Sequence, residues 1–383
     1  MNETIYMPVG EVCSSISDTY REKKNMVTLI NTSDVLEGRV LNHERVPNSN
    51  LKGQFKKTFQ RDDILYSEIR PQNRRFAYVD FSPIDYIAST KLMVIRAKKD
   101  VVSPKYLYYF LKNSSTVAEL QLLAETRSGT FPQITFSEVA NLTIPVPPLA
   151  VQEVIVQTMQ CLEDKTICNE QINDNLADLL QTIYQGRFGN DILAVNQGVL
   201  SDICSYSTDK VAVSELNVRT YFSTENMLSG KAGSTEATSL PTTSQTTACH
   251  KGDTLISNIR PYFKKIVYCE DKCGCSTDVL CFTPSQPCYS AYLFSTLYAD
   301  KFFAFMVAGS KGTKMPRGDK QQIMTYPVVL PSEEELAGFN TIASPLLEQI
   351  YSNRAENKRL SILRDTLLPK LMSGEINVSA IQL

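Results

Sequence analysis

Residues 63–71 read DILYSEIRP, and residues 253–261, 190 positions later, read DTLISNIRP. The similarity continues at the same offset, because Arg74-Arg75 in the first copy corresponds to Lys264-Lys265 in the second. A repeat of this length indicates that one folding unit occurs twice in the chain. The repeat therefore decides the architecture before any single motif is considered.

Further similarities give the extent of each copy. Residues 32–36 correspond to residues 224–228, and Gly129-Thr130 corresponds to Gly312-Thr313. Each copy ends at a proline, Pro148 or Pro331, that is followed by a long helical pattern. We therefore predict four segments: a domain at 1–150, a helix at 151–189, a domain at 190–330, and a helix with a tail at 331–383.

Each domain is expected to be mixed α/β, since short apolar runs lie between Pro, Gly and Asn residues. Residues 65–79 are predicted to form a hairpin whose turn lies at 71–73, which would bring Arg70, Arg74 and Arg75 together. A helix is predicted after Ser103-Pro104, because serine and then proline are favoured at helix starts.

The two connecting segments have coiled-coil patterns. In the first, Leu162, Asn169, Leu176 and Ile183 recur every seven residues, with Ile172 and Leu179 predicted at the intermediate position of the same seam. The second has an apolar stripe from Leu346 to Leu371 that is interrupted by Asn353 and Asn357. We expect these helices, the first about 50 Å long, to pair antiparallel, with seam asparagines fixing their register. Pro345 is expected to kink or restart the second helix. The predicted fold class is α+β: two pseudo-repeated domains separated by two long antiparallel coiled-coil helices.

Composition is that of an ordinary globular protein, with 43% apolar and 21% charged residues. No basic and apolar leader opens the sequence, so a cytoplasmic protein with reduced cysteines is expected. The net charge of −2 is unequally distributed. The four segments carry, in chain order, +3, −4, +1 and −2. A weakly basic balance in both domains is compatible with contacts to a polyanion, although the total is not that of a general nucleic-acid binder.

Few residues suit catalysis. The chain has only two histidines, and residues 309–314 lack the spacing of a phosphate-binding loop. No Asn/Asp-Pro-Pro-aromatic signature of an amino-methyltransferase occurs, because Pro147-Pro148 lies between Val146 and Leu149. We therefore expect no catalytic residue and no cofactor.

One cluster of cysteines is compatible with a metal site. Half of the ten cysteines lie between positions 269 and 288, at residues Cys269, Cys273, Cys275, Cys281 and Cys288. Their spacing lacks the paired two-residue gaps of zinc ribbons, and the first copy has no equivalents. We interpret them as core residues and predict no metal.

With the repeat and the helices established, the chain resembles the specificity subunits of type I restriction-modification systems over its full length. The most specific resemblance is C-terminal, where Leu360, Leu363, Arg364-Asp365, Leu367-Leu368-Pro369, Leu371 and Ser373-Gly374-Glu375-Ile376 are similar to the closing helix of that family. In the first copy, residues 129–132 followed by 144–149 and Gln152 resemble the exit from a target-recognition domain. The second copy departs from this pattern, with Glu335 at the position of Gln152 and Pro331-Ser332 in place of a double proline.

The resemblance implies a non-catalytic subunit with two target-recognition domains, each reading one half of a bipartite double-stranded DNA sequence. It also implies partners: two methyltransferase subunits around the helices, and motor-nuclease (restriction) subunits. Phosphate contacts would supply affinity and base contacts specificity. The candidate DNA-binding residues are Arg70, Arg74, Arg75, Arg127, Gly129, Thr130, Arg260, Lys264, Lys265, Lys311, Thr313, Lys314 and Arg317.

Two other functions remain open from the residues alone. A two-domain DNA-binding regulator without enzyme partners would have the same basic hairpins. A zinc-dependent hydrolase would use the cysteine cluster. Association with a methyltransferase subunit distinguishes the first alternative, and elemental analysis for zinc distinguishes the second.

Overall fold

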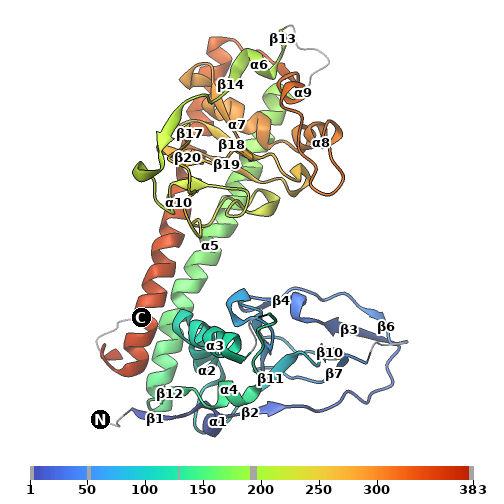
Figure 1. The fold of residues 1–383 in the computed structure, drawn as a ribbon, viewed down its shortest axis with the longest axis vertical. Coiled ribbons are helices and arrows are strands. Elements are labelled where there is room, and N and C mark those ends of the chain that lie inside the picture. Colours follow the sequence, from blue (N-terminus) through green and yellow to red (C-terminus); the bar gives the residue numbers. More distant parts are fainter. Residues whose placement is uncertain (1–3, 50–52, 128–129, 190–195, 379–383) are drawn as a thin grey trace. The chain divides into compact units, whose positions relative to one another are not determined.

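A computed structural model describes residues 4–49, 53–127, 130–189 and 196–378. The chain forms two compact units (Figure 1). Unit 1 consists of residues 1–166 and 358–383, and unit 2 consists of residues 167–357. Each unit thus contains part of both connecting segments.

A four-stranded antiparallel sheet is the centre of unit 1. Its order is β2 (Cys13–Ile16), β11 (Leu92–Ala97), β8 (Ile64–Ser67) and β9 (Phe76–Tyr78). The helices of the unit are α1 (Val9–Val12), α2 (Pro104–Lys112), α3 (Ser114–Arg127) and α4 (Phe136–Ala140). In Figure 1, α2 and α3 lie between this sheet and the long helix that follows.

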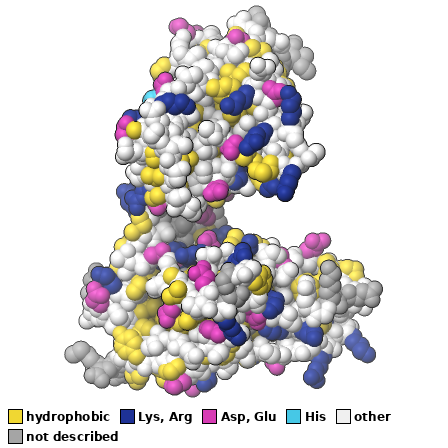
Figure 2. Space-filling view, viewed as in Figure 1, with side chains coloured by type: hydrophobic (Ala, Val, Ile, Leu, Met, Phe, Trp, Pro, Cys, Tyr) yellow, Lys and Arg dark blue, Asp and Glu magenta, His cyan; other side chains and the backbone are white. Residues whose placement is uncertain are grey.

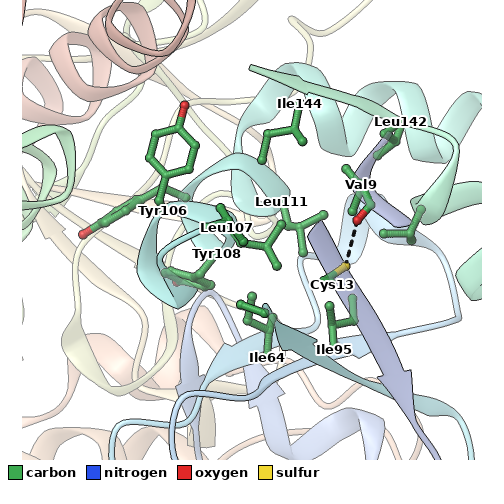
Figure 3. Close-up of a cluster of buried hydrophobic side chains, with 14 of the residues drawn as sticks. Val9, Cys13, Ile64, Ile95, Tyr106, Leu107, Tyr108, Leu111, Leu142 and Ile144 are labelled. Carbon is green, nitrogen blue, oxygen red and sulfur yellow. Dashed lines mark hydrogen bonds between the residues drawn. The ribbon is translucent and has the colours of Figure 1, made fainter. Parts of the chain in front are cut away.

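The core of unit 1 forms where α1 and α2 meet the sheet. Figure 3 shows Val9, Cys13, Tyr106 and Leu107 converging on strand residues such as Ile95, all of them buried. The Cys13 thiol donates to Val9 O at 3.2 Å, and the Tyr106 hydroxyl donates to Pro145 O at 2.7 Å. The polar atoms in this core are therefore paired, as burial requires.

Smaller sheets complete unit 1. The second four-stranded sheet has the order β6 (Val46–Pro47), β3 (Met26–Ile30), β10 (Tyr86–Ser89) and β7 (Phe55–Lys57). The two-stranded sheets pair β1 (Ile5–Pro8) with β12 (Thr143–Val146), and β4 (Val35–Leu36) with β5 (Arg39–Val40). Ile30, Ala88 and Leu92 are fully buried in a separate cluster to which strands of both four-stranded sheets contribute.

Unit 2 repeats the central sheet. The order β14 (Cys204–Tyr206), β21 (Val279–Pro284), β18 (Thr254–Ser257) and β19 (Ile266–Tyr268) has the same topology as in unit 1. Its helices are α6 (Leu200–Ile203), α7 (Ser290–Tyr298), α8 (Asp300–Ala308) and α9 (Lys320–Met324). The remaining strands are β13 (Gln197–Val199) paired with β22 (Pro327–Val329), and a sheet of order β15 (Lys210–Ala212), β17 (Gln245–Cys249), β20 (Cys273–Cys275) and β16 (Tyr221–Phe222).

The predicted duplication is confirmed at the level of strand register. Tyr66 pairs with Phe76 in unit 1, and Ile256 pairs with Ile266 in unit 2, at an offset of 190 on both strands. The predicted hairpin and the helix after Ser103 are present. Sequence reasoning missed several helices, among them α3 and α8, which begin shortly after α2 and α7 end, where the sequence has little local signal.

The connecting segments are two long helices, α5 (Leu149–Phe188) and α10 (Glu333–Ser373). In unit 2 they are antiparallel, because Asn169 Nδ2 donates to Asn357 Oδ1 at 2.8 Å and Asn353 Nδ2 donates to Asn173 Oδ1 at 2.9 Å. The predicted fold class and the pairing of seam asparagines are confirmed. In unit 1, Ile155 of α5 and Leu371 of α10 belong to one buried cluster.

One expectation about the seam of the helices was wrong in detail. Ile172 and Leu179 are 39% and 47% exposed, whereas Asn173 and Leu180 are buried. The intermediate seam position thus lies four residues after the first one, not three. The helix α10 continues through Pro345, so it does not restart there, and the kink expected as the other outcome stays a prediction. Buried packing of Ala343 and Leu347 on either side offsets the lost hydrogen bond.

Across the residues that the structure describes, no helix combines the length and apolar character needed to cross a membrane.

Candidate nucleic-acid interface

Each central hairpin ends in a short 3-10 turn, η2 (Pro71–Asn73) in unit 1 and η5 (Pro261–Phe263) in unit 2. The residues on both sides of each turn have left-handed backbones: φ is +44° at Arg70 and +51° at Arg74, and +51° at both Arg260 and Lys264. Such a conformation is costly for residues with a side chain, and persists where the surroundings impose it. The two turns therefore have the same backbone geometry at equivalent positions.

A second loop is tied to each turn through backbone hydrogen bonds. The Arg70 amide donates to Pro132 O at 3.1 Å, and the Arg260 amide donates to Pro316 O at 2.8 Å. The predicted hairpin group and the predicted loop group are therefore adjacent in each unit. In the sequence, Pro132 follows Gly129 by three positions, whereas Pro316 follows Gly312 by four. The loop of unit 2 therefore has one more residue than the loop of unit 1. Gly129 lies outside the described residues.

Arg74 anchors its turn to α3, and Lys264 anchors its turn to α8. Arg74 Nη2 donates to Ser114 Oγ at 2.9 Å, at the start of α3. Lys264 Nζ lies 2.9 Å from the carboxylate of Asp300, at the start of α8. Both cations are half-buried. The two equivalent cations therefore have the same role, which is to hold the turn against the start of a helix.

Arg75 and Lys265 hold the backbone of a neighbouring turn. Arg75 Nη1 donates to Ser33 O at 3.0 Å, and Lys265 Nζ donates to Thr224 O at 2.6 Å. Burial lowers the pKa of Lys265. Because these cations donate hydrogen bonds to main-chain carbonyl groups inside their unit, they are less available to a ligand than the sequence suggested.

The remaining candidates are on the surface. Arg70, Thr130, Thr313 and Lys314 are exposed, and neither Arg70 nor Lys314 has an ion-pair partner among the described residues. Three other cations are exposed but paired with carboxylates: Arg127 with Glu138 at 2.9 Å, Lys311 with Asp319 at 2.5 Å, and Arg317 with Asp278 at 3.0 Å.

Arg260 is intermediate between the anchored and the exposed cations. Its Nη2 donates to Lys314 O at 3.4 Å, and its Nε is buried without a hydrogen-bond partner in the described part of the chain. The guanidinium therefore retains unused donor capacity beside the loop.

Sequence reasoning missed several exposed side chains at the two turns. The turn of unit 2 presents Tyr262 and Phe263, and its loop presents Met315. The turn of unit 1 presents Gln72 and Asn73. Figure 2 shows hydrophobic side chains next to Lys and Arg side chains on the visible face of the part formed by unit 2. These residues could have been found in the sequence, because Gln72-Asn73 and Tyr262-Phe263 differ between the copies although the residues before them repeat.

Part of this chain is similar to proteins of known function. Residues 6–177 match the family described as type I restriction modification DNA specificity domain. The chain is also 38% identical over 187 residues to the type I restriction enzyme HindI specificity subunit of Haemophilus influenzae. Residues 6–177 therefore carry a type I restriction modification DNA specificity domain. The aligned stretch is 49% of this chain but only 41% of the Haemophilus subunit, so the match spans less than half of that relative.

Two solved structures share the fold of this chain. A chain solved in work on complex assembly and conformational transition of the type I R-M system matches with a TM-score of 0.53 and 16% identity, covering 98% of both chains. The type I restriction-modification S subunit from M. genitalium matches with a TM-score of 0.53 and 17% identity, covering 97% of this chain and 96% of that one.

Most of the clustered cysteines lie in the core of unit 2. Cys269, Cys273, Cys275 and Cys281 are buried together with Cys249, and Cys288 is exposed. The Sγ atoms of Cys269 and Cys273 are 3.6 Å apart. Among the described residues, no three His, Cys, Asp or Glu side chains are arranged to hold a metal ion.

Proposed function

We propose that this chain is the sequence-specificity subunit of a type I restriction-modification complex, in which each unit reads one half of a bipartite double-stranded DNA target. The observation that carries the proposal is the duplicated turn-and-loop surface, built on the same sheet in both units. The match to the specificity domain supports it. The chain would contribute recognition and no catalytic group.

The exposed cations are proposed to contact phosphates, and the turn and loop tips to contact bases. Arg70 and Lys314 are the strongest candidates because no carboxylate neutralises them among the residues described. Arg127, Lys311 and Arg317 would exchange a carboxylate for a phosphate. Thr130, Thr313 and Gly129 would allow close approach of the DNA backbone. For Arg74, Arg75, Lys264 and Lys265 we propose a supporting role, and for Arg260 a direct one through its unused donor.

The long helices are proposed to dock two methyltransferase subunits, which motor-nuclease subunits would join in the cytoplasm. Exposed apolar side chains on both helices support this: Ile172 and Leu179 on α5, and Ile362 and Leu363 on α10. A paired helix that still exposes large apolar residues suits a further helical partner.

The function is tested by mapping methylated adenines in genomic DNA from cells that make the methyltransferase subunit with or without this chain. We expect a split motif that is methylated only when the chain is present. A matched control replaces the codons of the chain silently, so that the transcript changes but the protein does not. Identical methylation with and without the chain would contradict the proposal.

A further inference from the structure

We propose that the two exposed residues of each turn determine which bases are read: Gln72 and Asn73 in unit 1 through amide hydrogen bonds, and Tyr262 and Phe263 in unit 2 through stacking and apolar contact. The inference rests on the proposed function and deepens it, because it assigns half-site specificity to two equivalent residue pairs of different chemistry.

The first argument is that the frame is constant while the central pair differs. In both turns the first residue is a buried proline, Pro71 or Pro261, between flanking residues with left-handed backbones. Matching backbone hydrogen bonds close each turn, from the Asn73 amide to Arg70 O and from the Phe263 amide to Arg260 O, both at 2.9 Å. A rigid frame that presents variable side chains is the arrangement needed to change specificity without changing the fold.

In unit 2 the presented pair is aromatic. Tyr262 is 50% exposed and Phe263 is 38% exposed, with ring centroids 4.8 Å apart and an angle of 56° between the rings. Lys265 Nζ lies 5.9 Å from the Phe263 ring. Two neighbouring exposed rings at a turn tip leave apolar area in water, which burial against bases would remove. Aromatic rings also stack on bases, and apolar groups contact the methyl group of thymine.

In unit 1 the presented pair carries two amides. The main-chain N–H of Gln72 donates to Gln121 Oε1 at 3.2 Å, which fixes the turn against α3. Both side chains are exposed, and within the described ranges neither amide group has a hydrogen-bond partner. Asparagine and glutamine form paired hydrogen bonds to the adenine edge in the major groove. Unit 1 is therefore suited to read an adenine in its half-site.

The surroundings of both pairs favour a polyanion over a protein partner. Arg70 is next to the turn of unit 1, and the loop that carries Lys314 is tied to the turn of unit 2 by the backbone bond at Arg260. The cations would hold the phosphates on either side of the groove while the central pair approaches the base edges.

The test exchanges the two pairs in the full chain, purified in complex with its methyltransferase subunit. One variant carries Tyr262→Gln with Phe263→Asn, and the other carries Gln72→Tyr with Asn73→Phe. Each complex selects duplexes from two libraries, in which one half of the wild-type motif is randomised, and the bound DNA is sequenced. We expect each variant to change base preference by about tenfold in one half only, and the two variants to affect opposite halves.

Several outcomes distinguish this inference from the function itself. A wild-type complex that selects no split motif contradicts the proposed function. A wild-type motif that both variants keep unchanged in both halves overturns the inference alone, as does a change in the same half by both. Thermal unfolding monitors folding, and the milder pair Tyr262→Phe and Phe263→Leu replaces the first variant if its midpoint falls. The Val199→Ala variant, which alters another exposed apolar residue of unit 2, is the matched control and should select the wild-type motif.

Discussion

Two aspartates at equivalent positions show how one residue can be stabilised differently in the two copies. Asp63 and Asp253 are both buried, and each accepts a backbone N–H three residues earlier at 2.8 Å. Asp63 also forms a double hydrogen bond with Arg96, at 2.7 and 2.8 Å. Asp253 has no cation in that place and instead accepts from the Cys281 thiol at 3.3 Å. Burial raises the pKa of the Asp253 carboxyl.

The raised pKa of Asp253 predicts a pH effect on stability. Because the folded state favours the protonated form, its contribution is complete below the ordinary carboxyl pKa and is lost as the pH rises through the raised value. The Asp253→Asn variant keeps a neutral acceptor at this position. We therefore expect the urea midpoint of the variant, relative to that of the wild type, to rise from pH 4 to pH 8.

The control for this effect is Asp63→Asn, which breaks the contact with Arg96 and should lower the free energy of unfolding by about 1–3 kcal/mol at neutral pH. The ring of His250 lies 3.8 Å from Asp253 Oδ2. Repeating the series in a His250→Gln background tests whether this neighbour contributes to the pH effect. The same pH trend in the Asp63 and Asp253 variants would refute the assignment.

We predict that the exposed cations at the two turns affect DNA binding, whereas the cations bonded inside each unit affect stability. Arg70→Ala and Lys314→Ala should weaken DNA binding by the complex similarly for all sequences and reduce the salt slope by about one per charge, with unchanged unfolding. Arg75→Ala and Lys265→Ala should instead lower the free energy of unfolding by about 1 kcal/mol, because they leave carbonyl oxygens unpaired. Fluorescence anisotropy at several salt concentrations and urea unfolding measure the two effects. Equal effects of all four substitutions on both measurements would disprove the division.

At the level of elements, the helix pair is specified by polar residues within an apolar seam. Asn173 and Asn353 are 8% and 6% exposed and bond to each other, next to the pair formed by Asn169 and Asn357. Buried amides cost desolvation unless they are paired, and only one register pairs them. The asparagines thus select the alignment of α5 with α10, while Leu180 and Leu347 supply apolar burial.

This arrangement predicts the cost of breaking one asparagine pair. Asn353→Ala leaves the Asn173 oxygen buried and unpaired, and should lower the free energy of unfolding by about 1–3 kcal/mol. Replacing both residues by leucine should restore most of that loss, because the polar groups are then removed together. A double-mutant cycle by urea unfolding measures the coupling, with the exposed Asn175→Ala as control. Additive losses in the double variant would argue against the pair.

For the whole molecule, charge limits what the chain can do alone. The net charge is −2, and the domain segments carry only +3 and +1. Nucleic-acid affinity depends mainly on cations that displace counterions from phosphates. A chain with so little surplus positive charge is expected to bind a duplex only weakly on its own.

We therefore predict that the isolated chain binds its target duplex at least about tenfold more weakly than the complex with methyltransferase subunits, and with a smaller salt slope. A gel-shift titration of both at the same salt concentration tests this, with a duplex of scrambled sequence as control. Equal affinity of the chain and the complex for the target would contradict it.

The repeat could be recognised from the sequence because it depends on local patterns. A short run of residues that are all buried sets the central strand in each copy, at 64–67 and 254–257, and the following proline sets the turn, so both hairpins have the predicted turn. The same holds for the long helices, whose existence follows from an apolar repeat sustained over many turns.

Only the tertiary structure decided which side chains face a partner. The sequence placed Ile172 and Leu179 in the seam, but packing buries Asn173 and Leu180. Steps of three and four residues differ by a single helical position, and contact with the second helix selects between them. It likewise determined that Arg75 is bound to Ser33 O, 42 positions earlier, while Arg70 stays exposed. A side chain's partner across the fold has no local signal, because it exists only once distant segments have packed together.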